Sequence, residues 1–189
     1  MKTKILFIAA VALGMVSQAM ARDLTAFELI KAGDPYVGAQ SKDKVLQIRS
    51  EKSVASLTPD VWHVLYYDPS TGMKSAQVTF GGGKEMDVSH PVHPFQMPYH
   101  ERDILDKSKL KVDSDEALKK AKSQPLLKNI TLKASQMTLD HSDMGPVWSI
   151  RLWAAKLNNP DKQVDIGMIT LSATDGSIVK SDLRPDRVD

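Results

Sequence analysis

The feature that most constrains the fold of this sequence is that two stretches present the same kinds of segment in the same order. Each stretch begins with a side chain suited to capping a helix, Thr25 or Asp113. A glutamate follows three residues later in both, Glu28 and Glu116. Such a pair satisfies the free N–H groups of a helix start, and apolar residues at helical spacing follow. The sequence therefore predicts one helix at the start of each half.

Four short segments with strand-like alternation follow each predicted helix. The predicted strands are 45–49, 59–66, 76–80 and 86–88 in the first half, and 130–134, 146–153, 167–171 and 178–180 in the second. The clearest match is a strand led by tryptophan, whose alternation gives the inward rows Trp62, Val64, Tyr66 and Trp148, Ile150, Leu152. We therefore expect an α+β fold of two repeated α-β-β-β-β units, each with one helix packed on an antiparallel sheet.

The first 21 residues have the pattern of an export signal. Lys2 and Lys4 precede an apolar run at 5–16, and the small-residue cleavage pattern ends at Ala21. Because twelve residues are fewer than the roughly 17 that a membrane-spanning helix needs, we expect cleavage rather than a retained anchor. Cleavage after Ala21 would leave a chain beginning at Arg22, in the periplasm or secreted, without membrane insertion.

A stretch rich in proline and histidine separates the two predicted units. Its prolines exclude a helix and favour an extended connector along the surface of one unit or in the groove between them. The predicted organisation is therefore a signal peptide (1–21), a first unit (22–88), a Pro/His-rich linker (89–109) and a second unit (110–189).

The second half is similar to a PepSY domain, a small module of exported peptidase propeptides and bacterial envelope proteins. The likeness rests on the capped helix, the strand led by Trp148 and a last hairpin at 169–179 with the turn Asp175-Gly176. The first half has a similar layout, but the glycines at 81–83 replace that turn. The resemblance implies tandem PepSY-like units with an α+β fold, which bind or restrain a protein partner such as a peptidase and carry no catalytic motif.

Composition excludes several classes of function. Without the two lysines of the leader, the chain has 23 basic and 23 acidic residues, which argues against nucleic-acid binding. It has no cysteine, so thiol nucleophiles and thiolate metal sites are excluded. The Gly-Gly-Gly-Lys run at 81–84 lacks the spacing of a phosphate loop, and no Gly-x-Ser-x-Gly elbow is present. We therefore expect no enzyme, no catalytic residue and no cofactor.

The linker offers one alternative, a soluble copper or zinc carrier. Imidazole and thioether groups are copper ligands, and four such residues lie close together in the linker: His90, His93, Met97 and His100. Their spacing matches no zinc signature, and they can equally be solvated side chains of an extended connector. We therefore assign no metal-binding residue and keep the carrier as the alternative function.

The outward rows of the two tryptophan-led strands are the remaining candidates for a binding surface. They comprise Val61, His63, Leu65 and Tyr67 in the first half and Val147, Ser149, Arg151 and Trp153 in the second. We expect something to cover these rows, because they are more apolar and aromatic than a solvated sheet surface. The cover is either another part of the chain or a protein partner anchored on Tyr67 and Trp153, and an edge strand that accepts a peptide is a third route. The sequence thus predicts an exported protein that binds a protein or peptide.

Overall fold

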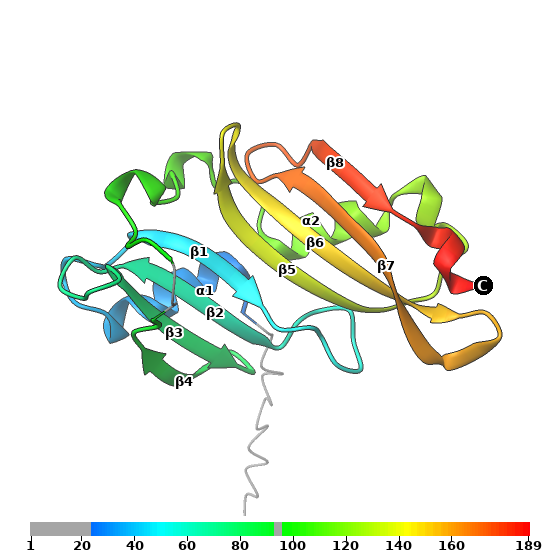
Figure 1. Cartoon of the computed structure of the whole chain (residues 1–189), viewed down its shortest axis with the longest axis horizontal. Helices are drawn as coiled ribbons and strands as arrows, with labels where there is room; N and C mark the ends of the chain where they lie inside the picture. The colour runs from blue at the N-terminus through cyan, green and yellow to red at the C-terminus, as the bar shows by residue number, and fades with distance from the viewer. Residues whose placement is uncertain (1–23, 93–95) are drawn as a thin grey trace, which may run out of the picture.

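The computed structural model describes residues 24–92 and 96–189, and its central element is one antiparallel sheet of eight strands (Figure 1). The strand order is β4-β3-β2-β1-β5-β6-β7-β8, so the chain builds the sheet outward in both directions from β1 and β5. The strands are β1 (Val45–Ser50), β2 (Val61–Tyr67), β3 (Ser75–Gly81), β4 (Lys84–Ser89), β5 (Leu132–Ser142), β6 (Gly145–Lys156), β7 (Asn159–Ser172) and β8 (Ile178–Leu183). The predicted signal peptide and its cleavage site lie outside the described residues.

Two short α-helices pack on the same face of this sheet, behind it in the view of Figure 1. They are α1 (Ala26–Gly33) and α2 (Ser114–Lys122). Short 3₁₀ turns complete the structure: η1 (Asp34–Tyr36), η2 (Glu101–Asp103), η3 (Lys107–Lys109), η4 (Pro125–Leu127) and η5 (Pro185–Val188). Among the described residues, no helix has the length and apolar character needed to cross a membrane.

The predicted α+β fold of two repeated helix-plus-sheet units is wrong. The structure is mostly a single eight-stranded sheet with a few short helices. β1 pairs directly with β5, where Ile48 lies opposite Leu139 and Arg49 lies opposite Thr138. The physical reason is that a strand left unpaired at an edge exposes its backbone groups, and pairing β1 with β5 removes two such edges. One helix of eight or nine residues also covers little apolar surface, so a core shared by both halves is larger than two separate ones.

The inward rows predicted for the tryptophan-led strands are confirmed. All six side chains of these rows are buried on the helix face: Trp62, Val64, Tyr66, Trp148, Ile150 and Leu152. They belong to one hydrophobic cluster that runs through both halves and includes both helices. Alternation along each strand therefore identified the core residues correctly, although they form one core rather than two.

The N-termini of the two helices lie close together, and a residue of the second half caps the helix of the first half. Thr25 forms the predicted capping box with Glu28. The carboxylate of Asp113 accepts the N–H of Ser114 in its own helix at 2.6 Å, and it also accepts the N–H of Phe27 in α1 at 3.1 Å. The start of α1 therefore depends on a side chain 86 residues away.

Replacing Asp113 with alanine should lower the free energy of unfolding by about 1–2 kcal/mol, because two helix starts lose an acceptor at once. Urea denaturation measures this loss. Asp115→Ala is the matched control, since this exposed carboxylate lies in the same first turn and has no hydrogen bond within the described residues. If both variants lose the same stability, Asp113 does not join the two halves.

Asp175, in the turn between β7 and β8, gives the edge hairpin a dependence on pH. The backbone N–H and the hydroxyl of Ser177 donate to its carboxylate and hold its pKa at about 2, below the ordinary value of 3.8. A lowered pKa stabilises the folded state above the unfolded-state pKa, and this contribution is lost as the pH falls through the folded-state pKa. Asp175→Asn should therefore be less stable than the wild type at neutral pH, and the difference should close between pH 3.8 and about 2. Unfolding curves recorded across that range test this, and a difference that persists at the lowest pH contradicts it.

Candidate functional site

The face of the sheet opposite α1 and α2, here called the helix-free face, carries a row of polar side chains that crosses all eight strands. From β4 to β8 the register aligns Asp87, Thr79, His63, Arg49, Thr138, Ser149, Thr170 and Lys180. Each of these residues, which we call the polar row, is half-buried or exposed. The middle of the helix-free face is therefore open to a partner, and its surface is hydrophilic.

The prediction that the outward rows are apolar and need a cover holds only for part of the face. Leu65 and Tyr67 are buried together with Leu46, and Tyr99 and Ile104 of the linker pack against them. The linker therefore provides the cover within the chain, as one of the two alternatives predicted. Tyr67 is 5% exposed, so the structure favours cover within the chain over a partner anchored on Tyr67.

Trp153 is half-buried on the helix-free face and is partly covered by the loop between β1 and β2. The ammonium nitrogen of Lys52 lies 4.6 Å from the centre of its ring, within the range of a cation–π contact. The same loop is fixed to β5 by the N–H of Ser53, which donates to the carbonyl of Ser135 at 2.8 Å. Trp153 therefore keeps part of its ring accessible, unlike Tyr67.

His63 lies at the centre of a chain of hydrogen bonds on the first half of the helix-free face. Its Nε2 is 2.8 Å from a carboxylate oxygen of Glu51, and its Nδ1 is 3.1 Å from the hydroxyl of Thr79 and 3.3 Å from the amide nitrogen of Gln77. The amide oxygen of Gln77 accepts an N–H of Arg49 at 3.5 Å. The amide of Gln77 can donate only to an unprotonated Nδ1, so this network assigns the ring proton to Nε2, which donates to Glu51. Each side chain in this hydrogen-bond network is thus oriented by its neighbour.

A cavity of about 380 Å³ lies between this network and the linker. Its lining residues are Gln47, Arg49, His63, Leu65, Gln77, Pro91, Gln96 and Tyr99. The amide nitrogen of Gln47 donates to the carboxylate of Asp140 at 2.8 Å, which ties β1 to β5 at the margin of the cavity. Within the described residues, Arg49 forms no ion pair with a carboxylate. The cavity therefore presents amide groups beside one guanidinium that has no ion pair within the described residues.

Glu51, His63 and Thr79 are residue types that also occur in acid–base–nucleophile triads. Thr79, however, lies in the middle of β3 and pairs with both neighbouring strands, whose ladders use the surrounding backbone N–H groups. Acyl transfer needs free donors that hold the oxyanion next to the nucleophile. This part of the described sheet offers no such donors next to Thr79.

The four linker residues considered for copper or zinc do not form a cluster in the part of the chain that the structure describes. His93 lies outside the described residues. Met97 is 79% exposed, and the backbone N–H of His100 donates to the carboxylate of Asp103. No group of three or more His, Cys, Asp or Glu that could hold a metal ion is found among the described residues. The carrier function therefore gains no support from this geometry.

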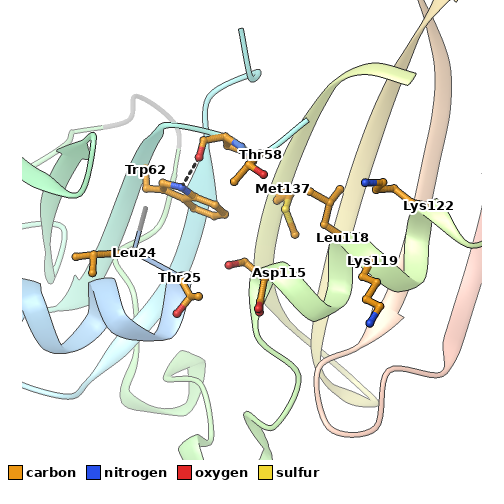
Figure 2. Close-up of a pocket in the computed structure, with 11 residues that line it drawn as sticks. Leu24, Thr25, Thr58, Trp62, Asp115, Leu118, Lys119, Lys122 and Met137 are labelled. Atoms are coloured by element: carbon orange, nitrogen blue, oxygen red, sulfur yellow. Dashed lines mark hydrogen bonds between the residues drawn. The ribbon is translucent and has the colours of Figure 1, made fainter. Parts of the chain in front are cut away.

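A smaller cavity of about 200 Å³ opens on the helix face, where the two halves join (Figure 2). Trp62 from the first half faces Leu118 and Met137 from the second half across it, and the indole N–H of Trp62 donates to the carbonyl of Pro59 at 3.1 Å. The other lining residues are Leu24, Thr25, Thr58, Ser114, Asp115, Lys119 and Lys122. Its apolar floor is continuous with the shared core, so this cavity belongs to the joint between the halves.

No sequence pattern singles out Arg49, Gln77 or Gln47 as functional residues. They are ordinary polar members of alternating strands, and they come together only because β1 lies between β2 and β5. The sequence did place His63 on an outward row, where the structure also has it. No family model, curated protein or solved structure matches this chain, so the chemistry of the helix-free face alone carries the functional proposal.

Proposed function

We propose that this chain is an exported, non-catalytic binding protein that recognises a protein partner with its helix-free face. The observation that carries the proposal is the open polar row across eight strands, part of which is oriented by hydrogen bonds. Side chains that are already fixed lose little entropy when a partner binds, so a pre-organised surface gains affinity. The hydrogen-bond network that joins Glu51, His63, Gln77 and Arg49 makes this part of the face pre-organised.

The second half of the same face supplies side chains that often anchor protein interfaces. Arg151 lies opposite Met168 in the strand register, and Trp153 lies opposite Asp165. Arginine, methionine and tryptophan are enriched in protein interfaces. The guanidinium of Arg151 is held 3.1 Å from the carboxylate of Asp165, so this part of the face is ordered as well. A partner that spans both halves would contact the polar network and this anchor group together.

The side chains of the edge strands make the helix-free face a better binding site for a partner than the edge of the sheet. β4 carries Lys84, Glu85 and Asp87, and β8 carries Lys180 and Asp182. Charged side chains on edge strands discourage the addition of a further strand. We therefore place the partner on the helix-free face.

The proposal also includes export and the class of partner. The leader predicted at 1–21 would direct the protein to the periplasm or the medium, where its partner must then be. Restraint of a peptidase, which the PepSY resemblance implies, requires a surface that binds the peptidase without being cleaved by it. The side chains of a folded sheet meet that requirement better than an extended loop.

The experiment is capture of the partner by residues 22–189 from native envelope or medium, with quantitative mass spectrometry of the bound proteins. Thr138→Arg combined with Ser149→Arg places bulk and charge in the middle of the polar row. The control is Lys119→Glu, an exposed change on α2 at the opposite face. Capture should fall by about 10-fold or more with the row variant and stay unchanged with the control. If both variants capture the same proteins to the same extent, the partner does not bind the helix-free face.

A further inference from the structure

We infer that the cavity between the helix-free face and the linker binds a carboxylate group of the partner through Arg49. This inference rests on the proposed function, and it assigns a ligand chemistry to one point of the proposed surface. The ligand is either the side chain of an aspartate or glutamate, or the carboxylate at the end of a chain. Both present the same planar anion.

The position of Arg49 makes it suited to hold an anion that approaches the sheet. It lies near the centre of the polar row, where β1 pairs with β2 on one side and with β5 on the other. The residue is exposed, and its guanidinium contacts the amide oxygen of Gln77 through one nitrogen. The remaining N–H groups form a flat fork that matches the two oxygens of a carboxylate. Gln77 is itself oriented by His63, so the guanidinium is pre-positioned at the cavity.

Arg49 is an arginine on the cavity lining that has no ion pair with a carboxylate within the described residues. Glu51 is bonded to His63, and the carboxylate of Asp140 accepts from Gln47. Arg151, on the same face, already has Asp165 at 3.1 Å. The carboxylates of Glu51 and Asp140, which are hydrogen-bonded to lining residues, repel an incoming anion, and they repel a doubly charged one more strongly, so we expect a singly charged carboxylate that binds weakly.

The shape of the cavity fits the group that carries the carboxylate. Its volume of about 380 Å³ lies at the lower end of the range of ligand pockets. Leu65 and Tyr99 line it beside the polar groups and give an apolar wall for methylene groups of the incoming chain. The amides of Gln47 and Gln77 supply further polar contacts at the same opening. A segment of a partner can therefore insert one acidic group between the linker and the sheet.

The test is an NMR titration of residues 22–189 that follows the side-chain N–H signals of Arg49 and of the lining residues Gln47 and Gln77. Three capped tripeptides serve as probes: acetyl-Ala-Glu-Ala-amide, acetyl-Ala-Ala-Ala with a free C-terminal carboxylate, and the neutral acetyl-Ala-Gln-Ala-amide. At least one of the two acidic peptides should give saturable shifts with a Kd of about 1–10 mM, and which of them binds more tightly identifies the source of the carboxylate. The neutral peptide should bind about 10-fold more weakly or not at all.

Two variants make the test decisive. Arg49→Gln should abolish the saturable shifts of the side-chain amide signals of Gln47 and Gln77, whereas the control Arg102→Gln, an exposed arginine of η2 that does not line the cavity, should leave them unchanged. Both residues are exposed, so circular dichroism should show an intact fold in each. Absence of saturation with both acidic peptides, an equal response to the neutral peptide, or unchanged binding by Arg49→Gln would overturn the inference. Capture that depends on Thr138 and Ser149 would survive that outcome, so failure of the carboxylate site is distinguishable from failure of the proposed function.

Discussion

Replacing Trp148 with alanine should lower the free energy of unfolding by about 3–5 kcal/mol, the range for truncating a large aromatic side chain in a core. Trp148 is fully buried, and its indole N–H donates to the carbonyl of Val112 at 2.8 Å. Its ring stacks on Phe27 of α1, with the ring centres 6.5 Å apart. The variant would therefore lose core packing, a hydrogen bond and a contact between the two halves.

The matched control for this prediction is Trp153→Ala. Trp153 lies on the same strand but on the helix-free face and is half-buried, so its loss should cost about 1 kcal/mol. Chemical denaturation of both variants measures the difference. Because Trp148 contacts both halves, Trp148→Ala should also keep a single unfolding transition that includes α1 and its strands. Two separate transitions, with the first half unaffected, would show that the halves fold independently.

Replacing Gly167 with alanine should cost about 2–4 kcal/mol, because the backbone there is suited only to glycine. Its φ is +101°, and a Cβ at this position would overlap the carbonyl oxygen of Asp182 on β8. The residue pairs with Leu152 at the margin of an irregularity in the pairing of β6 with β7, which lies between Gly167 and Asp165. The substitution should therefore weaken the pairing of β7 with β8 and disturb the second half of the helix-free face.

Gly72→Ala is the control for this second prediction. Nothing lies within 4 Å of a Cβ built at Gly72, and this glycine does not have a left-handed φ. Its replacement should change stability by no more than about 0.5 kcal/mol. Hydrogen exchange of the backbone amides shows where Gly167→Ala weakens the structure. Protection from exchange should be lost in β7 and β8. An unperturbed β8 with full stability would contradict this assignment of strain.

The sequence was sufficient for local structure and insufficient for the arrangement of the strands. Local sequence was enough to predict the capping pair Thr25 and Glu28 and the inward rows of β2 and β6, because these features depend on neighbours within a few residues. The pairing of β1 with β5 joins residues about 90 positions apart, and many strands offer a similar alternation. The pattern within a single strand does not determine with which other strand it pairs.

The candidate site was less predictable than the core for the same reason. Arg49, Gln77 and His63 come from three strands, and their hydrogen bonds exist only in the observed register. The cover of Tyr67 stayed open between two alternatives, because alternation shows on which face a side chain lies but not what covers that face. Tyr99 and Ile104 in the linker provide the cover, which agrees with the expected connector along the surface of one unit, but a proline-rich stretch has no periodic pattern that shows which side chains it covers.

The most direct test of the proposed recognition surface is site-specific photocrosslinking in the native compartment. A photoreactive amino acid is placed at Ser149 in the polar row or at Lys119 on α2, one position for each face. Ser149 should crosslink to one defined protein, the yield should fall when Thr138→Arg is added, and Lys119 should give no such product. Crosslinking of that protein from Lys119, or equal yields from both positions, would contradict the claim that the helix-free face is the binding surface.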